Sequence, residues 1–105
     1  MRTSIQTTIR DQLKAVAAKP EYGTLRAFQE RALTQFLADR PYTSEEFEWY
    51  IAPPAGTPEW PAFNVILPDT LQRRIRQEAL RIDVSMATFL RSALMWFLNR
   101  DESGG

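Results

Sequence analysis

The sequence of 105 residues contains neither cysteine nor histidine. Without them the chain has no disulfide, no thiol nucleophile, no thiolate or imidazole ligand for a metal, and no Ser-His-Asp triad. An enzyme would depend on carboxylates alone, and no pair of acidic residues lies on a pattern typical of an apolar cleft. We therefore expect a protein that is not an enzyme and that uses no metal or cofactor.

Long apolar runs are also missing. No stretch reaches the ~18 residues that a membrane span requires, and the first residues lack the apolar core of a secretory signal. We therefore expect a cytoplasmic protein with no membrane partner. The length fits a single domain, because domains cluster near roughly 100–150 residues, and 44% of the residues are hydrophobic, which is enough to build a core.

The chain has no excess of charge of either sign, with 13 basic and 13 acidic residues. Proteins that neutralise phosphates are usually basic, so this total argues against a nucleic-acid partner. The distribution is uneven, however. Residues 1–40 carry a net charge of +3, residues 41–60 a net charge of −4 and residues 61–105 a net charge of +1. Two basic segments are thus separated by an acidic one, and a nucleic-acid partner is not excluded.

The two basic segments contain an internal repeat. Residues 24–37 read TLRAFQERALTQFL and residues 85–98 read SMATFLRSALMWFL, an offset of 61 positions. The identical residues are spaced to share one helix face, and each segment begins with a hydroxyl residue suited to an N-cap, Thr24 or Ser85. The five identical pairs are Phe28/Phe89, Ala32/Ala93, Leu33/Leu94, Phe36/Phe97 and Leu37/Leu98.

Similar elements precede both repeats. In the second unit, residues 63–67 form a short β-rich run closed by Pro68, and a helix pattern begins at Asp69. In the first unit, residues 4–9 alternate like a half-buried strand, and the following helix should end before Pro20. Aligning Ile9 with Leu67 relates the two strands by 58 positions. Each unit is therefore predicted to contain a strand, a helix, a tight turn and a second helix.

This order, together with the segment VILPDTLQRRIRQEALRIDVSMATFLRSALMWFL, resembles the ribbon-helix-helix family of DNA-binding proteins. In that family two protomers pair their strands into an antiparallel ribbon that lies in the major groove. The resemblance implies a mainly α fold with a two-stranded antiparallel β-ribbon, in which two units of one chain form an intramolecular pseudo-dimer. It assigns residues 1–40 and 62–100 to the units, 41–61 to a connector and 101–105 to a flexible tail, all within one compact domain.

The resemblance implies binding to double-stranded DNA by a monomer in solution. Tandem chains of this kind are similar to TraY-type accessory proteins of conjugative relaxosomes, and the family includes Arc/MetJ-type repressors. The expected role is therefore a transcriptional repressor or a conjugation and DNA-transfer accessory factor. Alternating side chains of the two strands would face the bases, with Gln6 and Asn64 at equivalent positions. The expected base contacts are Ser4, Gln6, Thr8, Ala62, Asn64 and Ile66.

Phosphate contacts are expected where the second helix of each unit begins, because the backbone N–H groups of a helix N-terminus bind anions. Arginines flanking the first strand or lying near these helix starts would add positive charge. The expected phosphate contacts are Arg2, Arg10, Thr24, Leu25, Arg26, Ser85 and Met86. The run Arg73, Arg74 and Arg76 is interpreted as a solvated helix face.

The connector combines acidic and aromatic residues. Thr43-Ser44-Glu45-Glu46 has the form of a capping box, which predicts a short helix over residues 44–51. Its aromatic residues could pack over Met95 and Trp96 of the last helix, or these two residues could form a patch for a protein partner or a second copy of the chain. The acidic residues of the connector should lie away from DNA.

Other functions remain open. Ala62, Ile66 and the neutral total charge fit a protein-interaction module, similar to an antitoxin, whose ribbon no longer reads DNA. A helix-turn-helix built on residues 71–98 would account for neither the strand nor the first unit.

Overall fold

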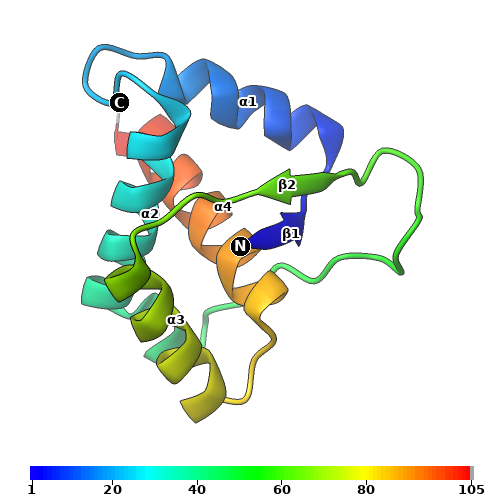
Figure 1. The fold of residues 1–105 in the computed structure, drawn as a ribbon, viewed down its shortest axis with the longest axis vertical. Coiled ribbons are helices and arrows are strands. Elements are labelled where there is room, and N and C mark those ends of the chain that lie inside the picture. Colours follow the sequence, from blue (N-terminus) through cyan, green and yellow to red (C-terminus); the bar gives the residue numbers. More distant parts are fainter. Residues whose placement is uncertain (105) are drawn as a thin grey trace.

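The computed structural model describes the backbone of residues 1–104 and the side chains of residues 1–100. The chain is mainly helical, with one two-stranded antiparallel ribbon in the described residues, as the sequence predicts (Figure 1). In chain order the elements are β1 (Arg2–Ser4), α1 (Thr7–Ala17), α2 (Leu25–Asp39), a 3-10 turn (Pro41–Thr43), β2 (Ala62–Asn64), α3 (Asp69–Arg81) and α4 (Met86–Gly104).

The ribbon pairs the start of the chain with a segment more than half the chain away. Arg2 lies opposite Asn64, and Ser4 lies opposite Ala62. Backbone hydrogen bonds continue this register on both sides of the strands. The Val65 N–H donates to the Met1 carbonyl at 2.8 Å, the Ile5 N–H to Pro61 at 3.2 Å and the Thr7 N–H to Glu59 at 2.8 Å.

The prediction of a strand over residues 4–9 was wrong, because β1 ends at Ser4 and α1 begins at Thr7. The residues 5, 7 and 9 fit a period of two, but Ile9 also shares a helical period with Leu13 and Val16. In the helix, Ile9 shares a face with Leu13 and Val16 and packs against the core in which those residues are buried.

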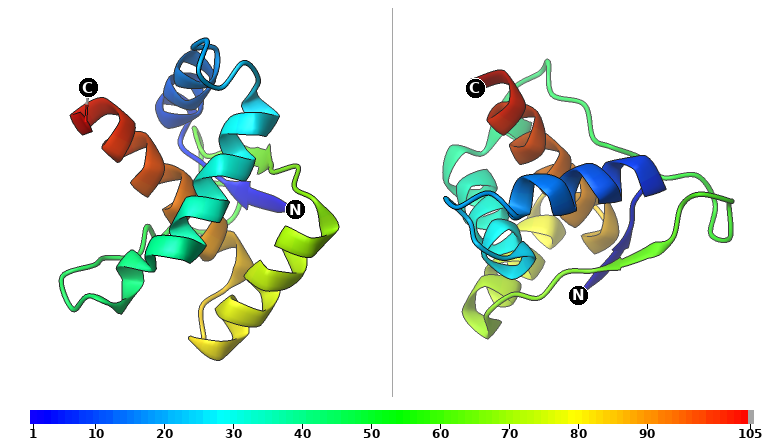
Figure 2. Two further views of the ribbon diagram at one scale, coloured as in Figure 1. Left: turned by 90° about the vertical axis from the view of Figure 1, so that its left-hand side faces the viewer. Right: turned by 90° about the horizontal axis from the view of Figure 1, so that it is seen from above.

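Two long helices cross at the centre of the molecule. Figure 2 shows α2 and α4 packed across each other, and the two helices are in contact. The five identical residues of each repeat face this crossing, and all ten are at most 8% exposed. Phe28 and Phe97 meet edge to face with ring centroids 5.4 Å apart, and Phe36 and Phe89 do so at 5.2 Å. The helix faces predicted from the repeat are confirmed.

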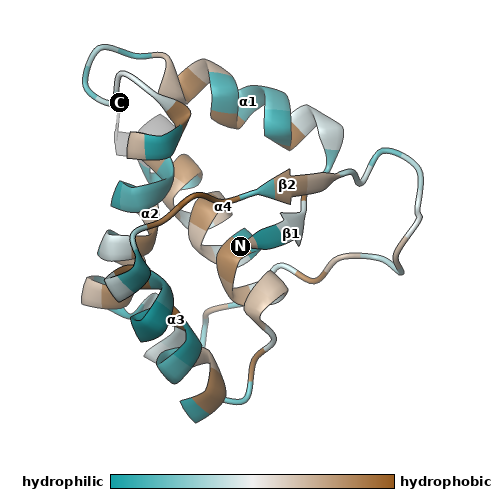
Figure 3. Cartoon of the chain, viewed as in Figure 1, coloured by the Kyte–Doolittle hydropathy of each residue, from teal (hydrophilic) through white to brown (hydrophobic). Residues whose placement is uncertain are grey.

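The first helix of each half flanks this crossing. α1 contacts both α2 and α4, and α3 contacts the same two helices. Most exposed residues of α1 and α3 are polar or charged, and both helices contain many hydrophilic residues (Figure 3). Ile5, Val65 and Leu67 extend from the ribbon segments into the same core, where each is at most 5% exposed. The core therefore lies between the ribbon and the four helices.

Two further boundaries were predicted from the sequence. α1 ends at Ala17, three positions before Pro20, and Gly23 takes the positive φ of 83° in the turn that follows. α4 continues through Gly104, so its end does not coincide with the tail boundary predicted at residue 101. Gly105 lies outside the described residues.

The predicted helix over residues 44–51 is absent, since this part of the connector contains no helical residue. Its backbone is instead tied to α4 at Tyr50. The Tyr50 N–H donates to the Ser92 hydroxyl at 2.9 Å, and the Arg91 Nε–H donates to the Tyr50 carbonyl at 2.6 Å. These bonds use backbone groups of Tyr50 that a helix would need for its own ladder.

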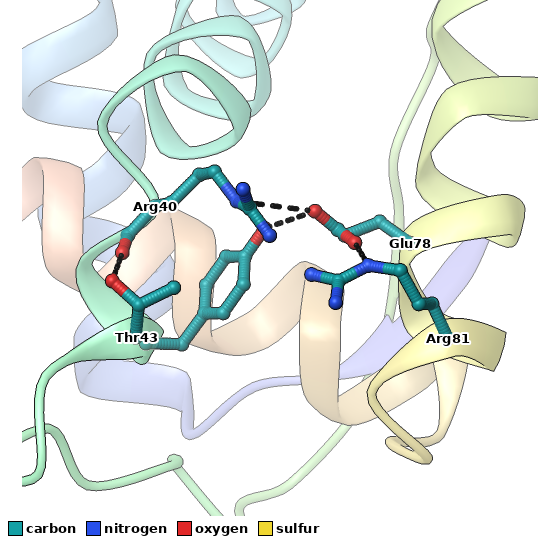
Figure 4. A network of polar contacts seen from close by, with 5 residues as sticks. Arg40, Thr43, Glu78 and Arg81 are labelled. Atoms are coloured by element: carbon teal, nitrogen blue, oxygen red, sulfur yellow. Dashed lines mark hydrogen bonds and ion pairs between the residues drawn. The ribbon is translucent and has the colours of Figure 1, made fainter.

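A polar network closes the end of α2 against α3 (Figure 4). Glu78 accepts a hydrogen bond from the Tyr42 hydroxyl at 2.7 Å, pairs with Arg40 at 3.5 Å and forms an ion pair with Arg81. The hydrogen bond from Arg81, with a smaller contribution from Tyr42, holds the pKa of Glu78 below its ordinary value. Burial and the neighbouring Glu78 raise the pKa of Tyr42.

Candidate nucleic-acid interface

The outward face of the ribbon is formed by the even-numbered residues. Thr3 and Phe63 point inward and are at most 5% exposed, so the residues beside them point outward. Arg2, Ala62 and Asn64 are exposed. Ser4 is half-buried, and Ile66, just beyond β2, is 55% exposed. Four of these five residues, all except Arg2, belong to the base-contact set predicted from the sequence.

The strand and first helix near the start of the chain align with β2 and α3 at an offset of 62 positions. The sequence predicted an offset of 58 for the strands. α1 begins at Thr7 and α3 at Asp69. With this offset the buried residues Thr3, Ile5, Leu13 and Ala17 correspond to the buried residues Val65, Leu67, Ile75 and Ala79.

The predicted equivalence of Gln6 and Asn64 was therefore wrong. The residue that corresponds to Asn64 at this offset is Arg2, and these two residues are also direct cross-strand partners. An approximate two-fold axis would pass between them. Arg2, which the sequence reading assigned to phosphate, thus lies at the centre of the outward ribbon face.

Two other predicted base contacts lie away from that centre. Gln6 precedes α1 directly, is half-buried and lines a cavity beside the ribbon. Thr8 is exposed in the first turn of α1 and is not part of the ribbon, because the helix begins one residue earlier.

The outer edge of β2 is covered by a buried polar side chain from α2. Gln29 is 2% exposed, and its Nε2 group donates to the Asn64 carbonyl at 3.0 Å. The Ile66 N–H donates in turn to Gln29 Oε1 at 3.2 Å. Gln29 occupies the repeat position of Leu90 in α4, and this mismatch was the sequence signal that could have revealed its role. The amide satisfies backbone groups that an edge strand leaves unpaired.

The outer edge of β1 is covered from α4 by Arg91, which is 4% exposed. One guanidinium nitrogen, Nη1, lies 3.1 Å from both the Ser4 carbonyl and the Thr3 hydroxyl. The Thr3 hydroxyl donates to the Ala87 carbonyl at 2.6 Å. Each outer edge of the ribbon is therefore fixed to one of the two central helices by a buried polar side chain.

Both central helices begin close to exposed hydroxyl caps. The Thr24 hydroxyl accepts from the Ala27 N–H at 3.1 Å, and the Ser85 hydroxyl accepts from the Thr88 N–H at 3.2 Å. Each cap uses the third N–H of its helix and leaves the first two, those of Leu25 and Arg26 in α2, without an intrahelical acceptor. The partial positive charge of the helix terminus adds to this anion-binding geometry.

The arginines predicted to contact phosphate differ in availability. Arg26 is exposed in the first turn of α2. Arg10 lies within α1, half-buried, with its Nε 3.6 Å from a carboxylate oxygen of Asp11, so part of its charge is neutralised locally. Leu25 and Met86, the first residues of α2 and α4, are half-buried and offer backbone rather than side-chain contacts.

The connector lies beside one side of the ribbon, at the start of α4, so the two sides of the ribbon have different surroundings. Pro53 and Gly56 line a cavity of about 340 Å³ together with Ser4 and with Ala87 in the first turn of α4. The start of α4 is thus bordered by the connector. The acidic residues Glu46 and Glu48 lie elsewhere, beside Arg100 near the other end of the described part of α4.

Met95 and Trp96, the candidate partner patch, are both half-buried against other parts of the chain. Trp96 is half-buried, its ring centroid lies 5.5 Å from that of Phe36, and the guanidinium carbon of Arg100 lies over the Trp96 ring, 4.7 Å from its centroid. Phe36 also contacts Phe47 and Trp49 of the connector. Met95 is half-buried against a cavity that Trp49 also lines. The connector aromatics therefore pack beside Met95 and Trp96, which favours the structural interpretation of these residues.

Comparisons with protein-family models, curated proteins and solved structures found no match to the chain. Among the residues that the structure describes, no group of acidic side chains is placed to hold a metal ion. No helix in the same part of the chain has the length and apolar character that crossing a bilayer requires.

Proposed function

We propose that the chain is a single-chain ribbon-helix-helix protein that binds double-stranded DNA with its ribbon in the major groove. A ribbon of two strands fits that groove, and its outward side chains can reach the base edges. Support comes from the pairing of β1 with β2, the crossing of α2 and α4, and the matching positions of α1 and α3. In this proposal residues 1–40 and 62–100 act as the two halves of a pseudo-dimer.

The observation that carries the proposal is the pair formed by Arg2 and Asn64, which face outward from directly opposite positions. Arginine donates bidentately to guanine O6 and N7, and asparagine pairs with adenine N6 and N7. Ser4 and Ala62 form the next cross-strand pair, and Ala62 and Ile66 could contact thymine methyl groups. Because Arg2 and Asn64 occupy equivalent positions but differ in type, the recognition site is predicted not to be palindromic.

Phosphate binding would come mainly from backbone groups. The exposed caps Thr24 and Ser85 mark two helix N-termini, one in each half, and Arg26 adds a cation at the first of them. Because the connector borders only the start of α4, the two phosphate contacts would differ in strength. This arrangement suits a chain whose total charge is zero.

The resemblance to known tandem proteins suggests two roles for such a monomer. It would act in the cytoplasm as a transcriptional repressor or as an accessory factor in conjugation and DNA transfer. Both roles need sequence-specific binding to duplex DNA without catalysis.

A competition gel shift on a duplex obtained by selection from random sequence tests the proposal. Replacing Arg2→Ala together with Asn64→Ala removes two bidentate contacts, each worth roughly 1–3 kcal/mol. We expect affinity for the selected duplex to fall at least about thirtyfold, while affinity for unrelated duplex and helicity are retained. Arg76→Ala, which removes an exposed arginine from α3, is the charge-matched control. Equal sequence preference in the double variant and the control would contradict the proposal.

A second candidate function is a protein-interaction module similar to an antitoxin. It is favoured by Ile66, which exposes 55% of an apolar side chain on the face where a polar base contact would be more usual. This candidate predicts no binding to random or selected duplex at low salt, together with a protein complex that Ile66→Lys disrupts.

A further inference from the structure

A cavity of about 300 Å³ opens beside the ribbon, and its lining includes none of the residues that carry the proposed DNA contacts. Its walls come from the end of the ribbon, the first turn of α1, the connector and the middle of α4. Most of the lining is apolar, including Ile9, Met95, Trp49 and Trp60. This volume is at the lower end of the range for small-molecule sites, and such sites combine apolar walls with a few fixed polar groups.

The charged group in this lining is Arg91, which is 4% exposed. Its guanidinium makes four hydrogen bonds, all to uncharged oxygen atoms. They belong to the carbonyls of Ser4 and Tyr50 and the hydroxyls of Thr3 and Thr88, at 2.6 to 3.3 Å. No carboxylate in the described part of the chain forms an ion pair with Arg91.

This environment leaves the charge of Arg91 incompletely compensated. A guanidinium has five N–H groups, so one N–H on Nη2 remains after the four bonds are made. Removing a cation from water is costly unless an opposite charge or a full set of hydrogen bonds replaces the water. In agreement, burial lowers the pKa of Arg91.

We propose that this cavity binds a small organic acid. The carboxylate would accept the remaining N–H of Arg91, and an aromatic or short aliphatic body would lie against Ile9, Met95 and Trp60. Gln6, half-buried in the same lining, supplies a second polar group near the acid. A carboxylate suits the site because it is both the missing counter-ion and a good hydrogen-bond acceptor for arginine.

Binding can be measured directly on the full chain by calorimetry and by following methyl resonances of Ile9 and Met95. The probes are 3-phenylpropanoate and octanoate, each compared with its neutral amide. We expect saturable binding of at least one acid with a Kd of about 1 mM or tighter, consistent with modest ligand efficiency for molecules of this size. The acid should bind at least about tenfold more tightly than its amide.

Two substitutions, tested beside one control variant, locate the site. Met95→Trp fills the cavity and should abolish binding, whereas Leu80→Trp, at a position 83% exposed on α3, should leave it unchanged. Arg91→Met should remove the preference for acid over amide. Because Arg91 also holds the ribbon, Met95→Trp provides the decisive variant if Arg91→Met unfolds. Equal affinities for acid and amide, undiminished binding in folded Met95→Trp, or no saturable binding of either acid would each overturn the proposal.

Discussion

Single polar side chains decide how the ribbon is held. Gln29 and Arg91 are buried on α2 and α4, and each bonds to the outer edge of a strand. The sequence marks Gln29, because the repeat has Leu90 at the same position, but it does not mark Arg91, which aligns with the exposed Glu30. The partners of both side chains depend on the strand register and could not be predicted. The strand register also places Arg2, predicted to contact phosphate, at the centre of the candidate base-reading face, opposite Asn64.

Replacing Gln29 with leucine restores the residue that the repeat has at Leu90, yet it should destabilise the protein. The Asn64 carbonyl and the Ile66 N–H would lose their partner, and unsatisfied buried backbone groups cost roughly 1–3 kcal/mol each. We expect the free energy of unfolding to fall by about 2–3 kcal/mol in urea denaturation.

Gln35→Leu is the control for Gln29→Leu. Gln35 bonds the exposed side chain of Asp39 within α2, so its replacement should change the free energy of unfolding little. A Gln29→Leu variant as stable as the original chain would show that the edge bonds are not needed.

Glu78 should make the free energy of unfolding depend on pH in the acidic range. Its pKa is lowered in the folded chain, so its contribution is full above the ordinary glutamate pKa and is lost as pH falls through the lowered value. Glu78→Gln should lose about 1 kcal/mol near neutral pH and show a flatter decline of stability below about pH 5.

The control for Glu78→Gln is Asp39→Asn, which removes a more exposed ion pair with Arg100 and should have a smaller effect near neutral pH. Parallel pH profiles for Glu78→Gln and the original chain would argue against the role of Glu78.

At the scale of elements, the sequence predicts the helices better than the segments that join them. α2, α3 and α4 follow from helical periodicity. β2 starts within one position of the predicted strand over residues 63–67 but ends at Asn64, three residues earlier than predicted. The prediction of a strand over residues 4–9 is wrong because Ile5 and Ile9 fit both the two-residue period of a strand and the 3.6-residue period of a helix. The packing of α1 against the other helices favours the helix. The helix over residues 44–51 fails because Arg91 and Ser92 bind the backbone of Tyr50, contacts that local sequence does not encode.

The start of α2 allows capping to be separated from DNA binding. Aspartate caps helices at least as well as threonine and interacts favourably with the helix dipole, so Thr24→Asp should keep the melting temperature within a few degrees. Its negative charge would repel a phosphate, and we expect DNA affinity to fall about tenfold.

The control for Thr24→Asp is Thr34→Asp, which adds the same charge to an exposed position near the middle of α2. Equal DNA affinities for the two variants would remove the start of α2 from the interface.

At the scale of the whole molecule, joining both halves in one chain makes strand pairing independent of concentration. Sedimentation should therefore give the mass of a single chain, 12.1 kDa, across micromolar concentrations. Dimerisation that depends on concentration would instead support a partner patch at Met95 and Trp96, most strongly if Trp96→Ala abolished it.

The balanced charge also sets the expected salt dependence of DNA binding. Few side-chain cations lie near the ribbon and the starts of α2 and α4, and connector acids such as Glu46 lie toward the other end of α4. The slope of log K against log salt should correspond to fewer than about ten released counterions. A steeper slope would require a basic surface that the described chain does not provide there.

If the outward ribbon face of this single chain reads duplex DNA as proposed, the purified chain should select preferred sites from a random duplex pool. We expect enrichment of a short motif that is not palindromic, and loss of that enrichment when Arg2→Ala and Asn64→Ala are combined. Recovery of no enriched sequence at low salt, or of the same motif with the double variant, would contradict the proposal.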